Sequence, residues 1–104
     1  METTYNYGVT FGTASDPPSG AYVAADFTGL TTYAFASGTK IILVFAHNAQ
    51  LVIRFRYSAT AAWGNDIVLW DAPQAEPIYL SAQYFQVQNY VAGSPCIFQV
   101  IGQW

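Results

Sequence analysis

Apolar and polar residues alternate with a period of two along several short stretches of this 104-residue chain. The first runs from Tyr5 to Phe11, where three aromatic rings and a valine alternate with small and polar residues. Such alternation predicts β-strands, because successive side chains of a strand point to opposite faces. The stretches that predict strands are, in chain order, 5–11, 21–27, 31–36, 40–46, 51–57, 66–70, 77–80, 83–89 and 96–103.

Two of these stretches carry more detailed predictions. The stretch 40–46 is continuously apolar after Lys40, which is typical of a central strand buried on both faces. In the stretch 51–57 a core face is expected from the residues that alternate with Arg54 and Arg56, namely Leu51, Ile53, Phe55 and Tyr57. Both arginines should therefore point away from the core.

Turn signals separate the predicted strands at short intervals. Glycine, proline, asparagine and aspartate supply them, most densely at 15–20, 63–66 and 92–95. No segment keeps a helical period of 3.6 residues. The pattern predicts an all-β fold, an antiparallel β-sandwich or jelly roll of eight or nine short strands. Residues 1–104 should form one domain, in which 1–20 is an N-terminal strand or arm able to contact a neighbouring subunit.

Composition adds that this domain is short of charge. Charged residues make up 9% of the chain, against about 25% in an ordinary globular protein, and aromatic residues make up 17%. Such a surface is either polar without charge or covered by other subunits, and we favour permanent assembly. A net charge of −3 and only three cations predict no nucleic-acid partner. The longest apolar run, 41–46, is too short to span a membrane, and no leader segment is visible.

The residues that commonly carry enzyme chemistry are few and scattered. His47 is the single histidine and Cys96 the single cysteine, and no spacing links either one to a partner. We interpret His47 as structural or solvent-facing and Cys96 as a small buried apolar residue. Asp66, Asp71 and Glu76 form the densest acidic group, and the two aspartates are interpreted as turn caps. We therefore expect no enzyme activity, no cofactor and no metal site.

Two groups of residues are candidates for binding. Arg54 and Arg56 can bind a carboxylate, stack on an aromatic ring or pair across a subunit boundary, and pairing with an acidic residue of a neighbouring strand or simple solvation is the alternative. The apolar contacts of an interface are assigned to Tyr84, Tyr90 and Trp104. Trp70 is expected in the core or at an interface. The second group is a carbohydrate site made of Trp63, Asn65 and Asp66, in which the indole ring stacks on a sugar and the polar groups bind hydroxyls. An ordinary turn with an aromatic plug is the alternative interpretation of this second group.

The layout of the second half of the chain resembles a known group of proteins. It comprises Gly29–Phe35, the apolar strand after Lys40, Leu51–Ser58 with its Trp-Gly-Asn-Asp turn, and the closing segments 82–89 and 97–102. Over about residues 26–104 this order resembles the small jelly-roll and β-sandwich proteins of bacteriophage virions, including head decoration (cement) proteins and tail accessory domains. The resemblance implies a homo-oligomer, with a trimer favoured, bound to a major capsid protein or another virion protein. It supplies no catalytic residues.

Two functions are therefore expected at this point. The first is a non-enzymatic structural protein of a virus particle, a capsid decoration or cement subunit made in the host cytoplasm and located in the virion. The alternative is a soluble cytoplasmic lectin that binds glycans through Trp63, Asn65 and Asp66.

Overall fold

The computed structural model describes residues 7–14, 27, 29–36, 39–70, 76–91 and 93–104. These residues contain strands and no helix, hence no helix able to cross a membrane. The strands are β1 (Tyr7–Ala14), β2 (Tyr33–Ala34), β3 (Ile41–His47), β4 (Leu51–Arg56), β5 (Ile67–Leu69), β6 (Glu76–Tyr79), β7 (Tyr84–Asn89) and β8 (Cys96–Gln103).

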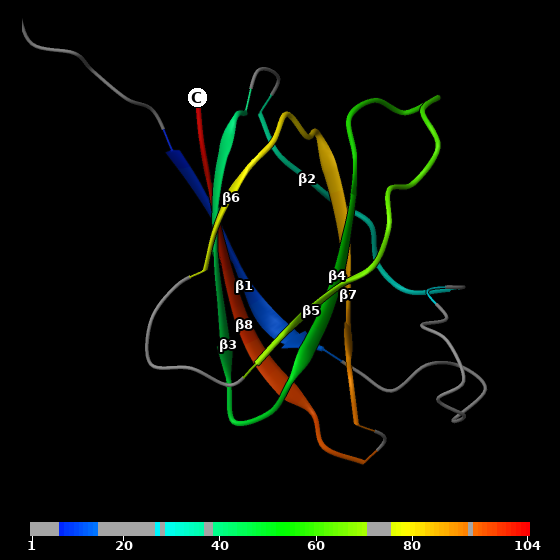
Figure 1. Cartoon of the computed structure of the whole chain (residues 1–104), viewed down its shortest axis with the longest axis vertical. Helices are drawn as coiled ribbons and strands as arrows, with labels where there is room; N and C mark the ends of the chain where they lie inside the picture. Colours follow the sequence, from blue (N-terminus) through cyan, green and yellow to red (C-terminus); the bar gives the residue numbers. More distant parts are fainter. Residues whose placement is uncertain (1–6, 15–26, 28, 37–38, 71–75, 92) are drawn as a thin grey trace, which may run out of the picture.

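The strands form two antiparallel sheets of four, which face each other in Figure 1. Sheet A has the order β1-β8-β3-β6 and sheet B the order β2-β7-β4-β5. The chain crosses between the sheets at nearly every connection, and only β4 and β5 are consecutive strands of one sheet. This order is that of a jelly roll, so the predicted fold class is confirmed.

The core lies between the sheets and is built from alternate residues of each strand. Sheet A contributes Ala14, Ile42, Val44, Ala46, Cys96, Phe98 and Val100. Sheet B contributes Leu51, Ile53, Phe55, Leu69, Phe85 and Val87. Phe35, which follows β2, stacks on Phe85 with ring centroids 4.8 Å apart. Cys96 is fully buried in this core, as expected of a small apolar residue.

Glycine at position 102 is required by this packing. An added Cβ there would lie 2.6 Å from Cδ1 of Phe35 and 3.1 Å from Cγ2 of Thr39. Thr39 is itself buried and donates its hydroxyl to the carbonyl of Ala36 at 2.8 Å. The missing side chain therefore lets the segment after β2 pack directly onto β8.

Several details of the strand predictions need correction. The strand predicted over 31–36 shrinks to the two residues of β2. β4 ends at Arg56, so Tyr57 is 69% exposed and not part of the core. Trp70 is 68% exposed, so of its two predicted places the core is wrong and the interface stays a prediction. The stretch 21–26, the segments 1–6 and 15–20 of the predicted arm, and Asp71 lie outside the described residues.

The largest correction concerns β3, which was predicted to be buried on both faces. It does occupy a central position in sheet A, between β8 and β6. Its alternate residues Ile42, Val44 and Ala46 are buried, but Leu43 and Phe45 between them are only partly buried. The strand is therefore apolar on both faces, while only one face is covered by the part of the chain that the structure describes.

Candidate interaction surfaces

The outer face of sheet A is apolar and open, and we call it the open face. Cross-strand pairing places Tyr7, Gln103, Ile41 and Tyr79 in one row, and Val9, Ile101, Leu43 and Pro77 in the next. Phe11, Gln99 and Phe45 form a third row, and Thr13, Ile97 and His47 a fourth. Directly paired residues share a face. These rows contain no Lys, Arg, Asp or Glu.

Large side chains of the open face are strongly exposed. Tyr79 is 78% exposed, Phe11 70% and Tyr7 69%. A shallow hollow on this face is lined by Phe11, Phe45, His47 and Ile97 among others. Contiguous apolar surface of this kind marks interaction sites, because moving apolar side chains out of water lowers the free energy.

The outer face of sheet B is covered by the chain itself, and we call it the covered face. Val52 pairs with Gln88 across β4 and β7, and both point outward. Yet Val52 is 2% exposed and Gln88 is completely buried. Figure 1 shows the described residues just before β2 on the outer side of β4 and β7. Among the described residues that precede β2, Phe27 lies outside any strand and is buried.

Arg54 connects the covered face to its covering. Its Nε donates to Oε1 of Gln86 at 3.0 Å, and its Nη2 donates to the same oxygen. Its guanidinium carbon lies 4.3 Å from the ring centroid of Phe27 and 4.4 Å from that of Trp63. Gln86 in turn donates through Nε2 to Oγ1 of Thr32 at 3.0 Å and to the carbonyl of Leu30 at 3.3 Å. The side chains therefore form a continuous polar and aromatic connection from β4 to the segment before β2.

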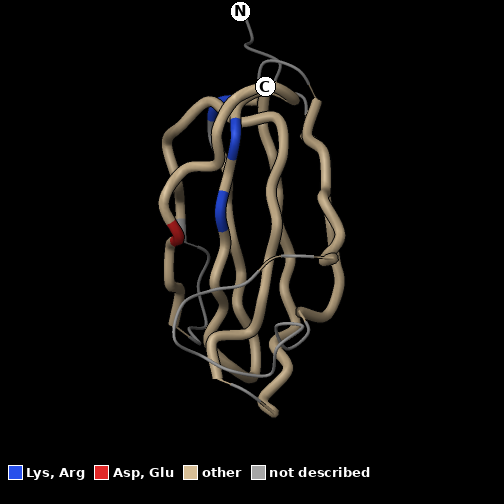
Figure 2. Tube along the Cα trace, turned by 90° about the vertical axis from the view of Figure 1, so that its right-hand side faces the viewer, with Lys and Arg blue, Asp and Glu red and all other residues tan. Residues whose placement is uncertain are grey.

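Arg56 extends this cluster toward the end of β4. Its guanidinium carbon lies 4.6 Å from the ring centroid of Trp63 and 5.1 Å from that of Tyr84. Its Nε is buried and has no hydrogen-bond partner in the described part of the chain. The attraction of a cation to an aromatic face is the contact that fixes this side chain. Figure 2 shows that the described part of the chain carries few charged residues. Two of them, Arg54 and Arg56, lie on the same strand, β4.

The residues assigned from the sequence to an interface are therefore divided among three places. Arg54, Arg56 and Tyr84 meet on the covered face. Tyr90 follows β7 and is 41% exposed. Trp104 follows β8, and its ring lies over Gly8 of β1, with Cζ3 3.6 Å from where a Cβ would stand.

The three residues of the predicted carbohydrate site have different surroundings. Trp63 is partly buried against Arg54 and Arg56. Asn65 lines a hollow between the two sheets, together with Phe55, Ile67, Leu80 and Ser81. Asp66 is exposed. The Trp63 ring is thus already in contact with two guanidinium groups.

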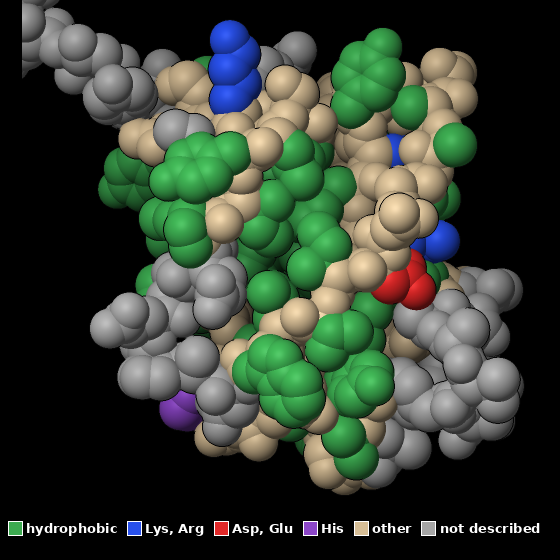
Figure 3. All heavy atoms as spheres, in the orientation of Figure 1, with side chains coloured by type: hydrophobic (Ala, Val, Ile, Leu, Met, Phe, Trp, Pro, Cys, Tyr) green, Lys and Arg blue, Asp and Glu red, His purple; other side chains and the backbone are tan. Residues whose placement is uncertain are grey.

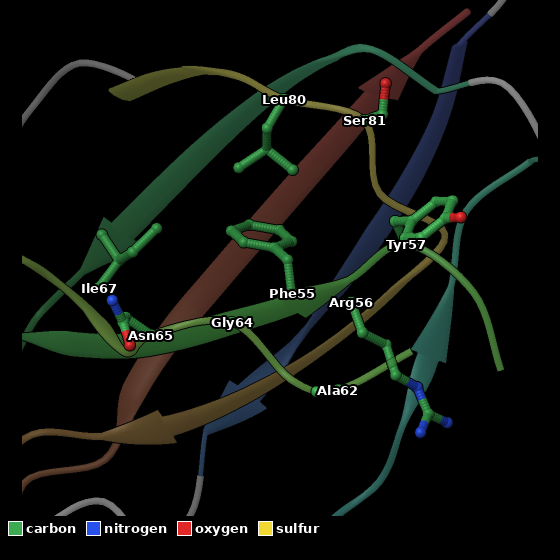
Figure 4. A pocket seen from close by; sticks show the side chains of 9 residues that line it. All are labelled: Phe55, Arg56, Tyr57, Ala62, Gly64, Asn65, Ile67, Leu80 and Ser81. Atoms are coloured by element: carbon green, nitrogen blue, oxygen red, sulfur yellow. The ribbon is translucent and has the colours of Figure 1, made fainter. Parts of the chain in front are cut away.

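The hollow that Asn65 lines opens on the side of the molecule where β5 and β6 form the edges of the sheets. Figure 3 shows hydrophobic side chains reaching the surface there. In Figure 4 the side chains of Phe55, Ile67 and Leu80 point into the hollow, while Arg56 points away from it. The lining includes no carboxylate, imidazole or thiol. Its apolar side chains, Phe55, Ile67 and Leu80, suit an apolar group.

The described residues contain no cluster of three His, Cys, Asp or Glu side chains suited to a metal ion. His47 is exposed at the end of β3. Cys96 donates its thiol to the carbonyl of Ala49 at 3.2 Å.

The open face was not predicted from the sequence, although two signals pointed to it. The first signal is that β3 and β8 carry apolar residues on both of their faces. The second is that β1 carries aromatic rings on one face. Comparison of the chain with protein-family models, curated proteins and solved structures finds no match. The resemblance to bacteriophage virion proteins therefore stays a prediction.

Proposed function

We propose that this protein is a non-enzymatic structural subunit that docks on another protein through the open face of sheet A. The observation that carries the proposal is the exposure of Tyr7, Phe11 and Tyr79 on a sheet face whose paired rows lack charge. A face of this composition is stabilised by contact with a complementary protein surface, at roughly 25 cal/mol per Å² of apolar area before ordering costs.

The particle to which the subunit binds is proposed from the resemblance noted above. A decoration or cement subunit of a virus capsid needs one adhesive face and no catalytic group. Repeated identical contacts across a shell then add avidity to a weak single contact. The open face is compatible with this requirement, and its lack of charge favours a contact that salt hardly weakens.

The experiment compares the wild type with a double variant, Phe11→Ser with Tyr79→Ser. Each protein is expressed together with the capsid genes that neighbour its own gene, and particles are separated on a density gradient. We expect the wild type to sediment with the particles and the double variant to stay at the top of the gradient. A matched control is Tyr57→Ser, which removes an equally exposed ring outside the open face.

Two results would contradict the proposal. If the double variant sediments with particles as fully as the wild type, the open face is not the docking surface. If the wild type itself stays at the top, the chain is not a capsid subunit. Circular dichroism of each purified variant shows whether it has folded.

A further inference from the structure

The four edge strands of the two sheets differ in how well they are protected. β2 has two residues and β5 has three, and β6 has four, of which one is Pro77. β1 has eight residues and contains neither a proline nor a charged residue. Short strands, prolines and charges are the usual means by which proteins block pairing at sheet edges. β1 has none of these.

The backbone of β1 has unused hydrogen-bonding groups along its free side. β1 pairs with β8 along its whole length, from Tyr7 opposite Gln103 to Ala14 opposite Cys96. In an antiparallel pair, every second residue directs its N–H and C=O groups away from the neighbouring strand. In the described part of the chain no residue bonds to these outward groups.

We propose that β1 pairs antiparallel with β1 of a second copy of this chain. The two copies of sheet A then form one continuous sheet with the order β6-β3-β8-β1-β1-β8-β3-β6. Antiparallel pairing of identical strands has a two-fold axis, so both copies satisfy the same groups at once. Because β1 carries no charge, the two copies do not repel one another along this edge, although each chain has a net charge of −3.

The side chains of β1 favour the same pairing. Tyr7, Val9 and Phe11 point to the open face, and in the dimer they become cross-strand or diagonal neighbours of the same residues in the second copy. Aromatic and β-branched pairs at such positions stabilise a sheet.

The area of the open face also favours a dimer. Four strands spaced about 4.8 Å apart and about seven residues long cover roughly 450 Å². A stable protein contact takes roughly 800 Å² from each partner. Joining two copies at β1 doubles the face to roughly 900 Å², which reaches that size. This step rests on the proposed docking function, whereas the edge pairing itself does not.

A two-fold pairing predicts an even number of subunits, in place of the trimer that the resemblance implies. Sedimentation velocity of the purified chain from micromolar to millimolar concentration measures this. We expect a reversible monomer–dimer equilibrium. A protein that stays monomeric throughout, or that forms trimers, overturns the edge pairing and leaves the docking proposal to the particle experiment.

Hydrogen exchange then locates the contact. We expect amide exchange at alternate residues of β1 to slow by about tenfold or more between dilute and concentrated protein, as mass action requires. The amides of β6, at the other edge of sheet A, serve as the internal control and should not change. If the dimer forms without slowing exchange in β1, the edge pairing is wrong.

Two variants extend the test. Val9→Pro and Thr10→Pro each remove one N–H, and because directions alternate, one of the two removes a group on the free edge. We expect the variant that keeps the wild-type fold to be monomeric; a folded variant that dimerises like the wild type overturns the proposal. Should neither variant fold, the exchange measurement on the wild type decides.

The variant Tyr79→Lys distinguishes the edge from the face. Tyr79 lies on the open face but on β6, far from β1 in the strand order. We expect this variant to dimerise normally while losing particle binding. If it becomes monomeric, the copies pair through their faces, which contradicts the edge pairing.

Discussion

The outer faces of the two sheets differ in how far their apolar residues are shielded from water. Both sheets carry apolar residues that point away from the core. On sheet B the outward Val52 is buried by the domain's own chain, and Arg54 links the strand to Phe27 and Trp63. On sheet A the outward residues Phe11 and Tyr79 stay exposed. Apolar periodicity in the sequence therefore indicates which faces of a sheet are apolar, but not whether such a face is buried by the same chain or by another molecule.

The largest effect is expected from removing the link that holds the cover of sheet B. Arg54→Ala leaves Oε1 of the buried Gln86 without these donors and removes contacts with two rings. We expect the free energy of unfolding to fall by about 2–4 kcal/mol, measured by urea denaturation. Lys40→Ala is the matched control, because Lys40 is exposed. Equal losses in the two variants would mean that Arg54 does not hold the cover.

The second largest effect is expected on the inner face of sheet A, and it tests whether that face is tightly packed. Gly102→Ala places a Cβ 2.6 Å from the Phe35 ring, so the ring or β8 must move. We expect a loss of about 1–3 kcal/mol of unfolding free energy, read from thermal or urea unfolding. Gly8→Ala, on the same inner side, meets Trp104 only at an ordinary 3.6 Å and should cost much less. A reversed order would show that the segment after β2 is loosely packed.

A smaller effect is expected when the aromatic part of the cover is removed. Trp63→Ala takes away the ring that both arginines contact, and we expect a loss of about 1–2 kcal/mol in urea denaturation. Trp70→Ala, which removes a strongly exposed ring, should change stability by less than about 0.5 kcal/mol.

The same tryptophan variant tests the alternative lectin function on a glycan array. If the role of Trp63 is to hold Arg54 and Arg56 in place, we expect no saturable glycan binding by the wild type. Binding that is lost in a folded Trp63→Ala variant would instead favour a carbohydrate site.

The smallest effect on stability is expected on the open face. Phe11→Ser with Tyr79→Ser should change the unfolding free energy of the monomer by no more than about 0.5 kcal/mol, because both rings are already exposed. The same variant should bind less of an apolar fluorescent dye than the wild type. Strong destabilisation of the isolated monomer would show that these rings support the fold, and the contrast between the two faces would disappear.

Much of the fold could be predicted from the sequence, because the alternation of apolar and polar residues marks the strands. It does not always mark the core face, since the apolar residues of β1, Tyr7, Val9 and Phe11, lie on the open face. The predictions for β1, β4, β7 and β8 depended on this signal and located these strands to within a few residues. Gln86 could not be recognised as buried, since the residues that it bonds, Leu30 and Thr32, lie more than fifty residues away in the sequence. Similarly, no spacing in the sequence brings Trp63 onto Arg54 and Arg56.

The pairing of β1 with β8 has a consequence for the order of folding. Tyr7 lies opposite Gln103, so the first strand stays without its neighbour until nearly the whole of this chain has been synthesised. Contacts between such distant segments form slowly, because a long loop must close before any of them is made. Neither the free edge of β1 nor the rows of the open face exist before that closure. Under the proposed function, the chain could dock or pair through these surfaces only after β1 and β8 have met.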